Sequence, residues 1–157
     1  MMGHQPAMTY SNIALLISGI DESVENMRNT PGSAHDPIVA AEIEGMIYGR
    51  NEIIAYWHTA VAFSADAQAR LEQVLPAGQI LFIDTSPVMR RGDVECVSKF
   101  MATEIASRTM AAGSAHDPIA AAYIEGVQKA HDSLMMIWHA ANIAAHAVSM
   151  AELELAQ

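Results

Sequence analysis

The chain is poor in basic residues, cysteine and aromatic residues, and each shortage excludes something. Eight Lys and Arg residues against eighteen Asp and Glu residues give a net charge of -10 over 157 residues. This balance argues against a nucleic-acid partner, because basic side chains supply most of the affinity for phosphates. Cys96 is the single cysteine and cannot form an intramolecular disulfide, so we expect a reducing compartment and a small, buried Cys96 side chain.

Targeting signals and catalytic motifs are also missing from the sequence. The N-terminus has no basic segment followed by an apolar run, so we expect a cytoplasmic protein. Residues 133–151 carry no Asp, Glu, Lys or Arg, but they are rich in Ala and contain His139, Asn142 and His146, so we expect no membrane partner. There is no glycine-rich phosphate loop, no nucleophile elbow and no Cys with an assignable His partner. We therefore expect no cofactor, and an enzyme is disfavoured.

What the chain does contain is an internal repeat. The heptapeptide Gly-Ser-Ala-His-Asp-Pro-Ile at residues 32–38 returns at residues 113–119, an offset of 81. At this offset, 15 of the 29 positions from residue 32 to residue 60 are identical. Two copies of one supersecondary unit can bury equivalent apolar faces together. No motif in the chain identifies a family.

The composition and the apolar spacing predict helices. Aromatic residues make up only 6% of the chain, so the 52% apolar fraction is mostly Ala, Ile, Leu, Val and Met. Apolar residues spaced by three and four predict helices over about 11–29 and 93–111, the second capped by Asp93. In the repeated heptapeptide, Gly suits the end of one helix, Asp the cap of the next and Pro its first turn. The next helices are therefore predicted over about 37–73 and 118–155, and the roles of His35 and His116 stay open.

These elements predict an all-α fold. Residues 1–157 form a single domain with a first repeat unit at about 11–73, a linker at 74–92 and a second unit at about 93–155. Each unit is a helical hairpin with one short and one long helix, and the two hairpins form a four-helix bundle. The small residues Ala41, Gly45 and Gly49, matched by Ala122, Gly126 and Ala130, predict a close helix crossing near Gly45 and Gly126.

The long helices are about 25 Å longer than the short ones, at 1.5 Å per residue. Their far halves carry apolar residues that the short helices could not cover, so we expect a homodimer. These residues are Ile53, Trp57, Ala60, Val61 and Phe63 in the first unit, and Leu134, Ile137, Trp138, Ala141, Ala145 and Val148 in the second. The two tryptophans are expected to be core anchors. In the linker, residues 79–84 are apolar and predict either a short strand or an extended segment.

Polar residues at spacings of seven mark one line on each long helix. The candidate ligand-binding residues are Glu44, Asn51 and His58 in the first unit and Glu125, Asp132 and His139 in the second. Glu44 and His58 lie roughly 21 Å apart along one helix, so no single helix can form a metal site. Parallel packing of the hairpins would place His58 beside His139, whereas antiparallel packing would place Glu44 near His139. The sequence leaves this choice open, and also allows that the line is a solvated face.

Two functions remain from these patterns. The first is a non-enzymatic interaction or accessory protein that binds its own copy, or another protein, through Met-rich and Ala-rich helices. The alternative is a metal- or small-molecule-binding bundle, of which a metal-dependent hydrolase is one form, that uses the six candidate residues at a helix crossing.

Overall fold

The protein is all-α, with four α-helices in the part of the chain that the structure describes. The computed structural model describes residues 5–75, 84–111 and 113–156. Helix α1 spans Tyr10–Arg28, α2 spans Pro37–Val74, α4 spans Arg91–Met110 and α5 spans Pro118–Leu155. The predicted helix bounds are confirmed to within two residues. Residues 76–83 lie outside the described part, and this range includes most of the predicted 79–84 strand.

The repeated heptapeptide turns the chain between the helices of each pair. Gly32 and Gly113 have φ angles of 85° and 80°, in the left-handed region that glycine adopts without strain. Asp36 and Asp117 then cap α2 and α5, and each side chain accepts a hydrogen bond of 2.9 Å from the backbone N–H two residues on. A short 3-10 turn separates glycine from cap in both places, at Ser33–His35 and Ser114–His116. The predicted roles of Gly, Asp and Pro are confirmed.

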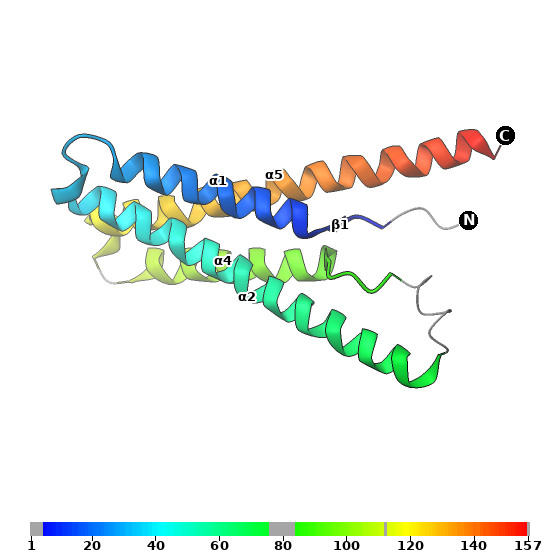
Figure 1. Cartoon of the computed structure of the whole chain (residues 1–157). Coiled ribbons are helices and arrows are strands. Elements are labelled where there is room, and N and C mark those ends of the chain that lie inside the picture. Colours follow the sequence, from blue (N-terminus) through cyan, green and yellow to red (C-terminus); the bar gives the residue numbers. More distant parts are fainter. Residues whose placement is uncertain (1–4, 76–83, 112, 157) are drawn as a thin grey trace.

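Helices α2 and α5 run in the same direction and cross at their glycines (Figure 1). A Cβ atom on Gly45 would lie 2.1 Å from the backbone oxygen of Tyr123, and one on Gly126 would lie 2.0 Å from the oxygen of Glu42. A Cβ on Gly49 would lie 2.4 Å from that of Ala130. The backbones are therefore in contact, and the predicted close crossing near Gly45 and Gly126 is confirmed. The sequence left open whether the two hairpins pack parallel or antiparallel, and the structure shows that they are parallel.

Helices α1 and α4 cover the N-terminal halves of α2 and α5. The core between them contains Leu16 and Ile20 from α1, Val97 and Met101 from α4, and Leu134 from α5, each at most 2% exposed. Trp57 and Trp138 are 9% and 7% exposed and belong to the same core, as predicted. Ile53, Leu134 and Ala141 are also buried within the chain, so the expectation that the short helices could not cover them is wrong.

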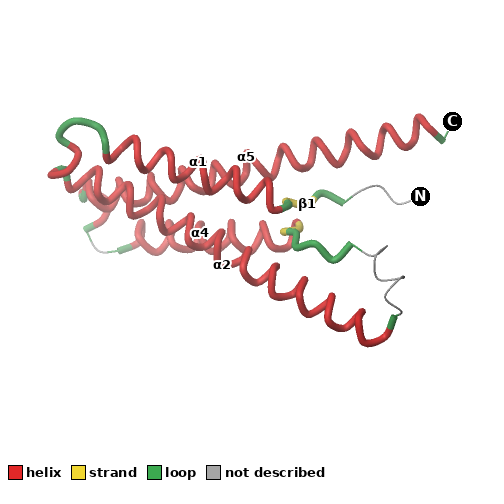
Figure 2. Tube along the Cα trace, in the orientation of Figure 1, coloured by secondary structure: helices red, strands yellow, loops and turns green. Residues whose placement is uncertain are grey.

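A small strand pair, which the sequence did not predict, joins the beginnings of α1 and α4 (Figure 2). Strand β1 spans Ala7–Met8, strand β2 spans Met89–Arg90, and the two are antiparallel. Met8 pairs with Met89, and both side chains are fully buried. Directly after the strands, Asn12 and Asp93 accept hydrogen bonds of 2.9 and 3.0 Å from the N–H groups of Thr9 and Arg90. The cap of α4 is therefore Arg90, with Asp93 three residues inside, and the predicted Asp93 cap is corrected.

Substitution of Gly45 by Ala should test the crossing directly. We expect Gly45→Ala to lower the free energy of unfolding by about 1–3 kcal/mol, because the added methyl group meets backbone atoms that cannot rotate away. Gly19→Ala on α1 is the matched control, because nothing lies within 4 Å of its Cβ position. The control should raise stability by about 0.5–1 kcal/mol, since alanine is the better helix former. Urea unfolding of both variants measures the difference, and equal stability would contradict the contact at Gly45.

Candidate functional site

The six candidate residues on the long helices all point outward. Glu44, Asn51, His58, Glu125, Asp132 and His139 are exposed in the structure. Asp132 accepts a hydrogen bond of 2.9 Å from Gln128, one turn before it, and Glu125 lies 3.8 Å from the ammonium of Lys129. Side chains of the other four make no hydrogen bond or ion pair within the described residues. The parallel arrangement thus does not turn the line of polar residues towards the other long helix.

No metal-binding cluster is present among the residues that the structure describes. Among them, no three His, Cys, Asp or Glu side chains come close enough together to hold one ion. His35 and His116 are exposed beside their capping aspartates. A ligand-binding role for the six candidate residues stays a prediction. Within the described residues, the structure does not bring three potential metal ligands together.

A polar link between α4 and α5 was missed by sequence reasoning. The hydroxyl of Ser98 lies 2.7 Å from Nε2 of His131. His131 Nδ1 is buried and has no hydrogen-bond partner among the described residues, and it lies 3.9 Å from the Asp132 carboxylate. The equivalent position 81 residues earlier is Arg50, which pairs with Asp21 on α1. The exchange of Arg50 for His131 at equivalent positions of the repeat is the sequence feature that pointed to this link, because residues 98 and 131 share no sequence pattern.

A second polar group lies where the crossing meets α4. Tyr123 donates a hydrogen bond of 3.0 Å to Glu104, which also accepts one of 3.0 Å from Arg108. The guanidinium of Arg108 stacks over the Tyr123 ring at 4.5 Å. Burial of the phenol, followed by its hydrogen bond to the Glu104 carboxylate, raises the pKa of Tyr123 to about 12. This cluster stabilises the neutral phenol and presents no open site to a ligand.

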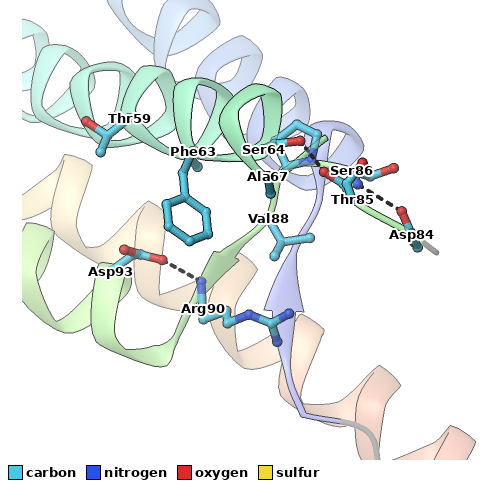
Figure 3. Close-up of a pocket in the computed structure, with 12 residues that line it drawn as sticks. Thr59, Phe63, Ser64, Ala67, Asp84, Thr85, Ser86, Val88, Arg90 and Asp93 are labelled. Carbon is cyan, nitrogen blue, oxygen red and sulfur yellow. Dashed lines mark hydrogen bonds between the residues drawn. The ribbon is translucent and has the colours of Figure 1, made fainter. Parts of the chain in front are cut away.

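Figure 3 shows a cavity of about 410 Å³ between α2 and the segment 84–88. Phe63 and Ala67 face it from α2, and Val88 faces it from the opposite side. The segment is attached to α2 by two hydrogen bonds: Ser64 donates to the backbone oxygen of Thr85, and the Thr85 hydroxyl donates to Gln68 at 2.7 Å. The cavity is thus partly apolar and lies beside an exposed aromatic ring.

Cys96 is exposed on α4, so the expectation that it is a buried side chain is wrong. Its thiol interacts with the hydroxyl of Tyr56, and this contact adds to burial in raising the pKa of that phenol.

The chain was compared with models of protein families, with curated proteins and with solved structures, and it matches none of them. The geometry of the chain itself therefore carries the functional argument.

The double variant His58→Ala/His139→Ala tests the candidate line. We expect its free energy of unfolding to stay within about 0.5 kcal/mol of the parent, because both side chains are exposed and without partners in the described residues. Elemental analysis of untagged protein, purified without chelator, should find no transition metal in either form. A metal present at one per chain or per dimer in the parent and lost in a folded variant would contradict this expectation.

Tyr123 gives the stability a dependence on alkaline pH. Its pKa rises from 10.0 to about 12 on folding, so the fold prefers the neutral phenol. This stabilisation is complete below pH 10 and is lost as the pH rises towards 12, because the unfolded chain then releases the proton first. We expect the unfolding free energy to fall less over this range in Tyr123→Phe than in the parent. Parallel urea titrations at each pH would show it, and identical slopes would contradict the assignment.

Proposed function

We propose that the protein is a non-enzymatic helical interaction protein that acts as a homodimer through the far halves of its two long helices. We call residues 59–74 of α2 and 143–155 of α5 the two arms. No side chain in either arm is fully buried. Large apolar side chains are nevertheless exposed along both, and this observation carries the proposal. They are Val61, Phe63 and Val74 on the first arm, and Ile143, Val148, Met150, Leu153 and Leu155 on the second.

Several large apolar side chains on the arms are strongly exposed. Phe63 is 76% exposed, Val74 74% and Leu155 88%. Burying one large apolar side chain contributes about 1.5–3 kcal/mol, so covering several of them would stabilise an assembly substantially. Clusters of this kind typically mark protein interfaces.

A second copy fits the shape and the charge of the arms. The arms diverge beyond the crossing, and in this view the segment with β1 and the segment 84–88 lie between them (Figure 1). A copy related by a two-fold axis would present the same two arms, and the exposed apolar side chains of the two copies could then pack together. Despite the net charge of -10, the second arm carries only two charged residues, Glu152 and Glu154. Residues 143–151 of this arm carry no Asp, Glu, Lys or Arg, so charge repulsion between copies is small along this stretch.

The cavity beside Phe63 supports the same interface. It opens next to the first arm and is lined on two sides by apolar groups. An apolar side chain from a partner's arm would fill it, much as a knob fills a hole in packed helices. Another protein with an apolar helix is the other kind of partner that this surface would accept.

A bilayer is the less suitable partner. In the described part of the chain, α5 is the one helix long and apolar enough to cross a membrane by length and composition, and 17% of its most apolar 18-residue window is buried. However, the first arm carries Asp66, Arg70 and Glu72, and hydrocarbon would not solvate these charges. A protein surface accommodates both arms at once.

We also propose that the chain arose by duplication of one helical hairpin and that the two hairpins form a four-helix bundle. The 81-residue offset that relates the identical residues also relates the starts of α2 and α5, at Pro37 and Pro118. The contacts at the crossing obey the same offset: Gly45 lies against Tyr123 and Gly126 lies against Glu42, and both the two glycines and their two partners are 81 residues apart. The alternative of a metal- or small-molecule-binding bundle has no such support from Glu44, His58 and the other candidate residues.

Replacement of one apolar residue on each arm tests the homodimer. We expect the parent to sediment at twice its chain mass of 16.9 kDa. Phe63→Glu/Ile143→Glu should raise the dimer dissociation constant at least about tenfold, because a buried unpaired carboxylate opposes association. The control Leu15→Glu changes an apolar residue that is 63% exposed on α1, away from the arms, and should remain dimeric.

The outcomes separate the possible partners. A parent that is monomeric at all accessible concentrations, or a Leu15→Glu variant as strongly affected as the arm variant, would overturn the proposed interface. A monomeric parent that co-sediments with lipid vesicles would identify a bilayer as the partner instead.

A further inference from the structure

Three basic side chains stand apart from the other five. Arg28, Arg50, Arg70, Arg108 and Lys129 each form an ion pair. Within the described part of the chain, Arg90, Arg91 and Lys99 form none, and they lie at the cap of α4 and in its first nine residues. In a chain with a net charge of -10, unpaired cations concentrated in one place are unexpected from composition alone.

Two of these cations line a groove of about 380 Å³ between α4 and α5. Arg91, Ser98 and Lys99 form its α4 side, and Met135, Trp138 and Asn142 form its α5 side. A volume in this range accommodates a small organic molecule. The groove therefore combines positive charge, two uncharged polar groups and an apolar wall.

The equivalent face of the first half is mostly apolar. There the Tyr10 ring packs on Trp57, with the ring centroids 6.4 Å apart. The tryptophan is retained at position 138, but the other eight residues that line the groove all differ from those 81 positions earlier. Three of these differences replace a less polar residue of the first half by a more polar one in the second: Arg91 occupies the position of Tyr10, Ser98 that of Ile17 and Asn142 that of Val61. Core packing does not require three polar exchanges around one retained tryptophan, so they point to a property of the groove.

His131 leaves the Ser98 hydroxyl free to donate. A buried N–H without an acceptor is rarer in proteins than an acceptor without a donor, so we assign the ring N–H to Nε2 and treat the isolated Nδ1 as an acceptor. Nε2 then carries the proton and donates it to the Ser98 oxygen, 2.7 Å away. The serine proton is consequently available to an acceptor in the groove.

We propose that the α4–α5 groove binds a small organic monocarboxylate. Arg91 and Lys99 supply the opposite charge, Ser98 and Asn142 donate hydrogen bonds, and Met135 and Trp138 contact the apolar body of the ligand. Glu95 also lines the groove, between the two cations on α4, and repels a second negative charge. The site therefore prefers one carboxylate to two.

Benzoate is a suitable probe, and the two tryptophans provide an internal control. We expect benzoate to shift the indole N–H resonance of Trp138 in a saturable manner and to leave that of Trp57 unchanged. Phthalate, which carries two carboxylates, should bind at least about threefold more weakly, because Glu95 repels the second one. An absence of a saturable shift, or equal shifts at both tryptophans, would overturn the proposal.

Variants with opposite expected signs separate binding from a loss of structure. Arg91→Gln and Lys99→Gln should each weaken benzoate binding about five- to tenfold, because each removes a charge-assisted contact. Glu95→Gln should instead tighten it by about threefold. Arg70→Gln on the first arm removes a cation far from the groove in sequence and is the matched control, expected to change nothing. If Glu95→Gln weakens binding, or if Arg70→Gln has the same effect as Lys99→Gln, the groove is not a carboxylate site.

Discussion

The contact between Gly45 and Gly126 is the constraint on which the rest of the structure depends. Each glycine meets the backbone of the opposite long helix, so α2 and α5 approach more closely than side chains would permit. Helices that cross at one point separate on both sides of it. Just C-terminal to the crossing, α1 and α4 fill the space with the core around Leu16 and Met101, which includes Ile53 and Leu134 of the long helices. On the C-terminal side, the arms diverge beyond the length of the short helices (Figure 1), and their apolar residues stay exposed.

The strand pair provides a second connection between the two halves. Met8 and Met89 pair across it and are fully buried, so the beginnings of α1 and α4 are held together at the level where the arms begin to separate. A two-residue strand contributes little by itself. Here it is supported by the caps that follow it, since Asn12 and Asp93 bind the N–H groups of Thr9 and Arg90. The short helices are thereby fixed at both ends, by the strand pair and by the glycine turns.

Local signals predicted most of the fold, because helix bounds and caps depend on neighbouring residues. Asp36 and Asp117 illustrate this, since both cap the helices that their sequence position indicates. The strand pair has no such signal, because two residues show no periodicity. The line through Glu44 and His58 shows a different limit: a spacing of seven places residues on one side of a helix, but does not say which side faces the protein. The Ser98–His131 link depends on the register between α4 and α5, which no local pattern specifies.

The differences between the halves are as informative as their identities. Identical residues lie at the turns, the caps and the crossing, where backbone geometry allows little choice, as at Gly45 and Gly126. Where α1 meets α2, Arg50 forms an ion pair with Asp21, whereas the equivalent His131 binds Ser98 between α4 and α5. Both links hold a short helix to a long one, so packing alone is satisfied by either. Only the second lies beside a groove lined by cations that form no ion pair within the described residues. One half can acquire a property that the other lacks where its surface differs while the core beneath is retained.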